Sequence, residues 1–382
     1  MQLGPSDPLR SVDAQALLAR ALAAAADAGV TRLADVTRLD RLGFPVWQAV
    51  RPMSRALSVH QGKGASDADA KVGALLEAVE SHAAEMFEAE GPVCPFVALP
   101  KGARALTIAD FAADRERPPA ADELRRWVEA EDLLGGGSLY LPLDFVSLDF
   151  TRGVPSLFDR ASNGVATAAS REEAVATALH EYIERDAVTE WQAKGLLACM
   201  ETTLDPDTVH FPWFRLWHER IAAAGATMRC YHVPSVTGTP VFACEINDTG
   251  KDGTPYRAIQ GRGCHPLPEI ALFKAVAEAL QGRATYIAGA RDDLLPSDYA
   301  PPASPAITIA FGMPLPPSMD GLEFARVEPG SLGVDALALA LEQAGYGRIA
   351  VVELARPQGL CVVRAFVCGL GSLLRRRRPP LP

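Results

Sequence analysis

The sequence predicts a mixed α/β (α+β) fold in which β-sheets are flanked by helices. Three amphipathic helical segments alternate with short apolar strands, and each of these helices follows a stretch that contains glycine. Two apolar runs late in the chain, residues 348–353 and 360–367, have the composition of buried strands. Alternation of strands and helices along a chain is typical of α/β and α+β architectures.

The composition is that of a globular protein with a large core. The chain has 382 residues, of which 48% are hydrophobic and 22% are charged, and its net charge is −10. This negative charge gives no electrostatic reason to expect nucleic-acid binding. No uncharged apolar run reaches about 18 residues, so no membrane span is expected. The first residues lack the basic and apolar regions of a signal peptide.

The seven cysteines are odd in number and are never spaced as CxxC. This pattern argues against a disulfide framework and against a zinc knuckle. We therefore expect a cytoplasmic protein whose thiols are mostly buried.

The chain is expected to begin with a helix and a strand. Residues 11–29 are rich in Ala and Leu, with Ser11 as the N-cap and Gly29 as the end of the helix. Residues 54–60 predict a strand that runs into a loop over residues 61–64.

Three longer helices follow, and each has its own start signal. The first is capped by Ser66 or Asp67, the second opens with a capping box from Ser170 to Glu173, and the third opens with the prolines of residues 266–268. A glycine-containing loop is expected before each helix, at residues 61–64, 162–164 and 261–263.

The remaining segments predict less regular structure. Residues 95–118 predict short strands and polar turns, and residues 139–150 are rich in strand formers. Proline-rich loops are expected at residues 296–305 and 314–317, and the Arg/Pro-rich end at residues 375–382 is too polar and proline-rich to be helical.

One seven-residue pattern occurs three times, at residues 74–80, 178–184 and 275–281. Each copy places a carboxylate and a second carboxylate or amide three residues apart in an apolar helix: Glu77 and Glu80, Glu181 and Glu184, Glu278 and Gln281. Residues at this spacing share one helix face. Like charges on such faces repel, so a fold that gathers them needs cations between them. Oxygen ligands suit hard ions such as Mg²⁺, and the pattern therefore predicts a metal–phosphate site.

A single pair of glutamates on a helix is usually exposed charge. Three repetitions of one offset favour a function instead. The similar intervals between the copies fit either a degenerate internal repeat or three parts that converge on one site, and the copies are too long and too divergent for a solenoid.

Basic residues near these helices matter equally, because a triphosphate needs Lys or Arg as well as Mg²⁺. The candidates lie close to the three helices in sequence: Lys63, Arg185, Arg283, Arg291, Arg51 and Arg55. Residues 62–64 do not form a P-loop, because the GxxxxGK[ST] frame is missing.

Other reactive residue types are weaker candidates. His82 and His180 fall at positions that packing explains. Cys264 and His265 are adjacent, which suggests a thiol–imidazole pair, but neighbours in sequence seldom point at each other and no third group is evident. The four arginines of residues 375–378 are usually a solvated tail, with a peptide or partner contact as the alternative.

Several of these segments together resemble a YcaO-domain protein, over roughly residues 30–370. The resemblance rests on five stretches: residues 51–64, 74–80, 163–164, 181–186 and 278–283. Residues 32–47, which run into residues 48–52, resemble the TfuA-associated subgroup.

The resemblance implies a YcaO-like fold around a Mg-ATP site, with three parts to the chain. These are an N-terminal helical segment and lead-in at 1–50, the amide-activating domain at 51–370 and an Arg/Pro-rich tail at 371–382.

The resemblance also implies roles for particular residues. Those that would hold Mg²⁺ are Glu77, Glu80, Glu181, Glu184 and Glu278. Those that would hold nucleotide or phosphates are Ser58, Lys63, Asn163, Arg185, Gln281 and Arg283. The family's first motif usually begins with Ser where this chain has Gly73, so one side-chain contact is missing there.

The implied activity is ATP-dependent phosphorylation of a backbone amide oxygen in a peptide or protein. In the TfuA-associated subgroup a sulfide equivalent, supplied through a TfuA-like partner, adds to the amide carbon. The resulting oxyanion attacks the γ-phosphate of ATP, and loss of phosphate leaves a thioamide, ADP and phosphate. ATP is needed because oxide is a poor leaving group and phosphate a good one. No side-chain general base stands out.

Two alternatives remain. Azoline-forming cyclodehydratases of the family end in Pro-x-Pro-x-Pro, whereas positions 378, 380 and 382 here are Arg, Pro and Pro, so thioamide formation is favoured over cyclodehydration of Cys, Ser or Thr. A non-catalytic, nucleotide-regulated peptide-binding module is the second alternative. A homodimer is left open as the assembly.

Overall fold

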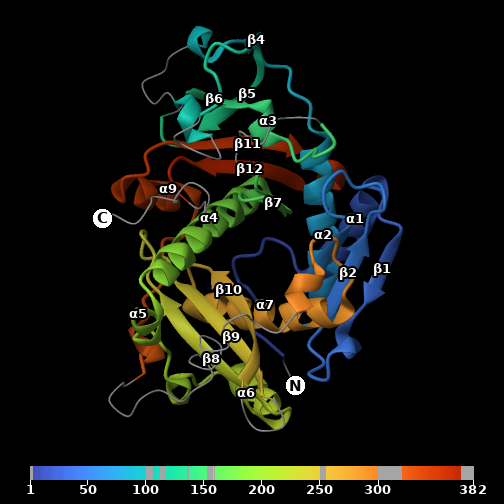
Figure 1. Cartoon of the computed structure of the whole chain (residues 1–382), viewed down its shortest axis with the longest axis vertical. Helices are drawn as coiled ribbons and strands as arrows, with labels where there is room; N and C mark the ends of the chain where they lie inside the picture. Colours follow the sequence, from blue (N-terminus) through green and yellow to red (C-terminus); the bar gives the residue numbers. More distant parts are fainter. Residues whose placement is uncertain are drawn as a thin grey trace.

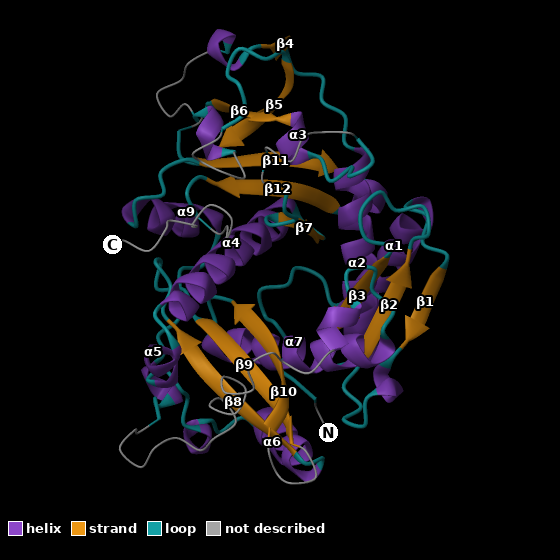
Figure 2. Ribbon diagram, viewed as in Figure 1, coloured by secondary structure: helices purple, strands orange, loops and turns teal. Residues whose placement is uncertain are grey.

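The computed structural model describes residues 3–99, 106–111, 118–135, 137–152, 158, 160–249, 255–299 and 321–370. Within these ranges the chain forms three antiparallel sheets with helices packed against them (Figures 1 and 2). This arrangement confirms the predicted mixed α/β class.

The first sheet has the order β1-β2-β3, formed by Arg32–Asp35, Val46–Val50 and Val59–Lys63. Helices α1 (Ala14–Asp27) and α2 (Asp67–Met86) pack together beside it, and their apolar faces form one core cluster. Because β1 pairs with β2 and β2 pairs with β3, two strands from the first 50 residues share a sheet with a strand from the residues that follow them.

The second sheet is a meander of β8 (Ala226–Val233), β9 (Val241–Thr249) and β10 (Pro255–Cys264). Helix α7 (Pro268–Ala288) packs against β9 and β10, and α6 (Pro212–Ala223) packs against β8. The aromatic residues of α6 and the apolar face of α7 share a second core cluster.

The third sheet is the largest, with the order β4-β5-β11-β12-β7 and with β6 also paired to β5. Its strands are Val93–Cys94, Arg125–Asp132, Ile349–Ala355, Cys361–Val367, Val165–Ala168 and, for β6, Ser138–Pro142. Every residue of β12 is buried, which confirms the predicted late core strands. Helix α4 (Arg171–Ala193) packs on β12 and β7. The shorter helices are α3 (Leu143–Val146), α5 (Leu196–Met200) and α9 (Val334–Gln343).

Glycines bring α2 and α7 unusually close to their strands. A Cβ atom on Gly62 would lie 1.9 Å from the carbonyl oxygen of Ala70, and one on Gly261 would lie 2.1 Å from the backbone nitrogen of Ala279. The loop expected at residues 61–64 is therefore wrong for residues 61–63, which complete β3, and the loop expected at residues 261–263 is wrong because these residues belong to β10. The glycines serve close packing of backbone on backbone rather than chain reversal.

Other expected boundaries also shift. The strand expected from residue 54 begins at Val59. The N-cap of α1 is Asp13 instead of Ser11, whose hydroxyl donates to Glu173 at 2.7 Å. Ser66 and Ser170 cap α2 and α4 as predicted. Of the expected capping box, the Ser170 side chain accepts the N–H of Glu173, whereas the Glu173 carboxylate accepts a hydrogen bond from Ser11.

The third helix begins at Pro268, as the prolines predict. In the stretch from 139 to 150 the strand ends at Pro142 and a helical turn follows. Most of the expected proline-rich loops, and the tail at 371–382, lie outside the described residues.

All seven cysteines fall in the described ranges, where none of them forms a disulfide, and six of them are buried, as expected. Within the same ranges no helix combines the length and the apolar character needed to cross a bilayer.

The glycine contacts give a direct test. We expect Gly62→Ala to destabilise the protein by about 3 kcal/mol, because the new methyl group overlaps the backbone of α2. Gly137→Ala is the control, because a Cβ atom there meets nothing within 4 Å, and we expect a change below about 0.5 kcal/mol. Urea unfolding of both variants measures the difference; equal stabilities would contradict the packing described.

Candidate functional site

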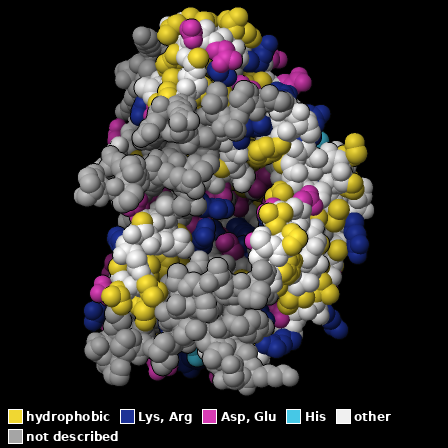
Figure 3. All heavy atoms as spheres, in the orientation of Figure 1, with side chains coloured by type: hydrophobic (Ala, Val, Ile, Leu, Met, Phe, Trp, Pro, Cys, Tyr) yellow, Lys and Arg dark blue, Asp and Glu magenta, His cyan; other side chains and the backbone are white. Residues whose placement is uncertain are grey.

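Helices α2, α4 and α7, which carry the three copies of the pattern, converge on one region. Figure 3 shows a hollow near the middle of the molecule, over the space that these helices enclose in Figure 1, where basic and acidic side chains gather. In addition to burial, the charge of Glu181 on α4 contributes to the raised pKa values of Glu77 and Glu80 on α2. The charge of Glu278 on α7 contributes in the same way to the raised pKa of Glu181. The structure therefore brings the three copies together, as one of the two readings of the repeat requires.

Two strands connect the three helices at this point. The backbone N–H of Gln61 in β3 donates to Glu77 of α2 at 2.7 Å, while the Gln61 side chain accepts a hydrogen bond from Thr285 of α7. The N–H of Thr167 in β7 donates to Glu80 at 2.7 Å. Each strand thus fixes a carboxylate by a main-chain donor.

The turn before β7 fixes a carboxylate of α4 by a main-chain donor in the same way. The N–H of Gly164 donates to Glu181 at 2.9 Å. Gly164 has a φ of +79°, and a Cβ atom there would meet the carbonyl oxygen of Ala365 and the ring of Tyr182, so only glycine fits. Asn163, a predicted nucleotide ligand, precedes it in this turn and is half-buried.

The carboxylates are short of compensating charge. Burial, followed by the neighbouring Glu278 carboxylate, raises the pKa of Glu184 to about 7. Burial also raises the pKa of Glu77 and Glu181, and burial together with Glu77 raises that of Glu80 well above its ordinary value. A cation placed among these groups would recover the energy lost to desolvation and repulsion.

Two predicted cations lie among them. The Nζ atom of Lys63 donates to Gln281 Oε1 at 2.9 Å and lies 3.3 Å from Glu278 Oε2, so it joins β3 to α7. The guanidinium of Arg185 lies 3.3 Å from Glu181 Oε1. Burial opposes its charge, but Glu181, Glu184 and Glu278 raise the pKa of Arg185.

Arg283 is not brought to this region, and its assignment as a nucleotide ligand has no support from the geometry. It is buried and pairs with Asp40 at 3.0 Å and with Asp248 at 2.7 Å. It follows Gln281 by two residues, which turns it about 200° around α7. Arg283 instead ties α7 to the turn after β1 and to β9.

Ser58 lies beside the loop that follows α7. Its backbone N–H and its hydroxyl donate to Asp292, at 2.7 and 2.8 Å. Arg291, the preceding residue, has a charge that favours ionised Glu77. Arg291 was a predicted basic candidate near the third helix, whereas Asp292 had no assigned role. Lys274, whose charge favours ionised Glu184, was likewise unassigned.

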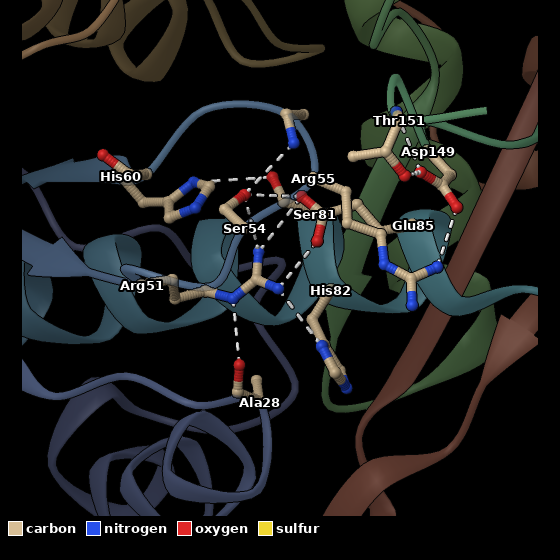
Figure 4. A network of polar contacts seen from close by, with 12 residues as sticks. Ala28, Arg51, Ser54, Arg55, His60, Ser81, His82, Glu85, Asp149 and Thr151 are labelled. Atoms are coloured by element: carbon tan, nitrogen blue, oxygen red, sulfur yellow. Dashed lines mark hydrogen bonds and ion pairs between the residues drawn. The ribbon is translucent and has the colours of Figure 1, made fainter. Parts of the chain in front are cut away.

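The turn that carries Ser58 is held by a buried ion pair (Figure 4). Arg51 donates to Glu85 Oε2 at 2.8 Å and to the carbonyl oxygen of Ala28 at 3.0 Å, and Ser54 donates to Glu85 at 2.6 Å. Arg55 pairs with Asp149 at 2.7 Å. Arg51 and Arg55 are therefore engaged in positioning this turn, away from the clustered glutamates.

The thiol–imidazole alternative gains no support. Burial raises the pKa of the Cys264 thiol, which disfavours the nucleophilic thiolate. The Nδ1 atom of His265 accepts the N–H of Leu267 at 3.1 Å, and its Nε2 atom lies 3.4 Å from Asp7.

The oxygen-rich donor set fits Mg²⁺ shared with phosphates. Among the described residues no three Asp, Glu, His or Cys side chains are grouped closely enough to bind a metal by themselves. Mg²⁺ usually takes one or two carboxylates together with phosphate oxygens, and keeps several waters. Separated carboxylates with raised pKa values, beside Lys63 and Arg185, suit that mode of binding.

Comparison with known proteins agrees with a nucleotide- and metal-binding fold of this kind. A family model described as YcaO cyclodehydratase, ATP- and Mg²⁺-binding, matches residues 61–371. The chain belongs to the YcaO family, and the predicted cofactors, ATP and Mg²⁺, are confirmed.

Two relatives illustrate the range of the family. An uncharacterized protein in the tfuA 3′ region of Rhizobium leguminosarum bv. trifolii is 34% identical over 281 residues, which are 72% of this chain and 66% of that protein. An uncharacterized protein of Methanothermobacter thermautotrophicus is 30% identical over 367 residues, 90% of each chain. The Rhizobium relative supports the TfuA-associated subgroup.

Two solved structures share the fold. YcaO from Methanopyrus kandleri, bound with AMPPCP and Mg²⁺, has a TM-score of 0.70 and 22% identity and covers 97% of both chains. A heterocyclase in complex with substrate and cofactor has a TM-score of 0.76 and 22% identity, and the match covers 96% of this chain and 53% of the heterocyclase.

The raised pKa of Glu184 predicts a pH-dependent stability. The folded state holds this proton more tightly than the unfolded chain, so stability falls as the pH rises from 4.5 through about 7. Without Mg²⁺ and nucleotide, we expect Glu184→Gln to match the wild type near pH 4.5. At about pH 8 we expect it to exceed the wild type by on the order of 2 kcal/mol.

Urea unfolding across this pH range measures the effect. Glu172→Gln, at an exposed position in the first turn of the same helix, should follow the wild type throughout. A Glu184→Gln variant less stable than the wild type at about pH 8 would contradict the assignment.

Proposed function

We propose that this protein uses Mg-ATP to phosphorylate the oxygen of a backbone amide in a peptide or protein, and that the product is a thioamide. The observation that carries the proposal is the convergence of three carboxylate-bearing helices around Lys63 and Arg185. Such a site suits a polyphosphate and its metal ions, and phosphoryl transfer depends mainly on positioning and charge stabilisation.

The chain's own residues would divide this work. Glu77 and Glu80 from α2, Glu181 and Glu184 from α4, and Glu278 from α7 would hold Mg²⁺. Lys63, Arg185 and Gln281, with Ser58 and Asn163 on the adjoining turns, would hold the nucleotide and its phosphates. ATP supplies a phosphate that turns the amide oxygen into a good leaving group. Arg283 would act from outside the site by fixing α7.

The position of Lys63 suggests how phosphates enter. Its ammonium group bridges Gln281 and Glu278. Once metal ions neutralise Glu278, the Lys63 side chain could turn from this position toward a phosphate. The main-chain donors to Glu77, Glu80 and Glu181 would keep those carboxylates in place during the exchange.

Thioamide formation is favoured over cyclodehydration by the resemblance to the TfuA-associated subgroup and by the relative in a tfuA 3′ region. A TfuA-like protein would supply the sulfide equivalent, which adds to the amide carbon. The heterocyclase with a shared fold keeps azoline formation as the second candidate. A non-catalytic, nucleotide-regulated peptide-binding module is disfavoured, because the set of acidic residues proposed to hold Mg²⁺ is nearly complete.

Glu181→Gln tests the site. It removes one charge but keeps the hydrogen bond from Gly164, so we expect Mg-ATP-dependent turnover to fall by about 100-fold or more with little change in thermal stability. Glu172→Gln on the same helix is the matched control. Wild-type turnover in Glu181→Gln would remove this residue from the site.

The reaction itself is tested by ATP hydrolysis and product mass, with candidate peptides and a TfuA-like protein present. Hydrolysis that depends on the peptide separates an enzyme from a binding module. A product heavier by the difference between sulfur and oxygen identifies a thioamide, whereas the loss of one water identifies an azoline.

A further inference from the structure

A second concave region lies away from the converging helices, where the end of α2 meets the third sheet. A cavity of about 520 Å³ is lined by residues 87–91 after α2, by Glu129 and Glu131 of β5, by residues 351–353 of β11 and by Arg171 of α4. A second cavity of about 400 Å³ shares Phe87 and Glu88 with it. Together they form one groove, which we call the α2–β11 groove.

The strands beside this groove are incompletely paired. β5 and β11 pair at only two positions, Glu131 with Val351 and Asp132 with Ala350. Beyond Val351, β11 continues to Ala355 with β12 as its one strand partner in the described chain. An exposed strand edge is a template for an added strand from another peptide.

The walls of the groove carry an excess of negative charge. Its lining includes five exposed glutamates: Glu88, Glu90, Glu129, Glu131 and Glu353. Arg171 pairs with Glu131 and Arg356 pairs with Glu353. Arg126 donates to the carbonyl oxygens of Ala89 and Gly91, so the net negative charge of the walls comes from Glu88, Glu90 and Glu129 set against this one arginine. The smaller cavity is mainly apolar and includes Val79, Ala83 and Leu354. These walls complement an extended segment with cationic side chains and at least one apolar side chain.

We propose that the α2–β11 groove docks a cationic, extended segment of the peptide substrate, which adds to the free edge of β11. The proposal rests on the proposed function to the extent that the substrate is a peptide. The groove is lined both by glutamates and by residues 351–353 of β11. Main-chain hydrogen bonds to β11 would supply affinity, and the glutamates would select basic side chains.

The groove also lies at a usable distance from the candidate site. At 1.5 Å per residue, Arg171 lies about 15 Å along α4 from Glu181. An extended peptide spans about 3.3 Å per residue. The substrate's basic segment should therefore lie about four or five residues from the amide that is modified.

Binding of a labelled decapeptide of alternating arginine and valine tests the proposal, without ATP so that turnover is not required. Fluorescence anisotropy at low salt gives its Kd for the wild type and for the double variant Glu88→Lys, Glu90→Lys. We expect the variant to bind about tenfold more weakly, because two rim charges are reversed. The matched control is Glu201→Lys, Glu219→Lys, which changes net charge equally at exposed positions outside the groove, and it should stay within about twofold of the wild type.

Hydrogen exchange identifies where the probe lies. We expect the probe to protect backbone amides in residues 352–355, and an alternating glutamate–valine decapeptide to give no protection there. Equal weakening in both double variants, or protection elsewhere, would overturn the proposal. The proposal would also be overturned if the protein self-associates without the probe, as measured by sedimentation, and this self-association protects residues 352–355. If probe binding behaves as expected while no amide is modified, the groove stands and the proposed function fails.

Discussion

The structure depends on holding several partly desolvated carboxylates close together against their mutual repulsion. Burial and neighbouring carboxylates raise the pKa of Glu80 and Glu184, so the site itself opposes the fold that creates it. The opposing energy comes from the core clusters built on the three sheets, which include apolar residues of the same three helices. Main-chain N–H groups from Gln61, Thr167 and Gly164 then fix the carboxylates locally. A cluster built this way is ready for a cation before one arrives, which lowers the cost of reorganisation on binding.

The cations within the protein have two separate tasks. Lys63 and Arg185 lie among the glutamates, where they partly offset the negative charge. Arg51 and Arg283 are buried in ion pairs that hold a turn and a helix in place. A buried pair of this kind costs little only while both partners are present. Arginine pairs outside the site therefore preserve the arrangement of the charges inside it.

Much of the fold and part of the site could be predicted from the sequence. The i, i+3 spacing of carboxylates within apolar helices correctly predicted α2, α4 and α7. The three copies of one offset left an internal repeat and a shared site equally open, and tertiary structure was needed to bring the copies together. Gly62 and Gly261 were misassigned to loops, because a glycine that admits a neighbouring backbone has the same local signature as one in a turn. Arg283 was misplaced because closeness in sequence to Gln281 says nothing about which side of the helix it faces. Arg291 was named only as a nearby cation and Asp292 was left without a role, because their approach to Glu77 and Ser58 is set by tertiary packing.

The contact between Gly62 and α2 has a consequence for how this site can change over time. The main-chain contact between Gly62 and α2, which contains almost no side chain, fixes the angle at which α2 packs on β3. It therefore also fixes the direction of Glu77 and Glu80. Substitutions among the apolar residues that pack α2 against α1 can thus alter core volume without re-aiming the carboxylates. The core can drift in sequence while the orientation of the helix stays fixed. The sequence tolerance of the two faces of α2 should accordingly differ, with wide variation toward α1 and almost none at the strand.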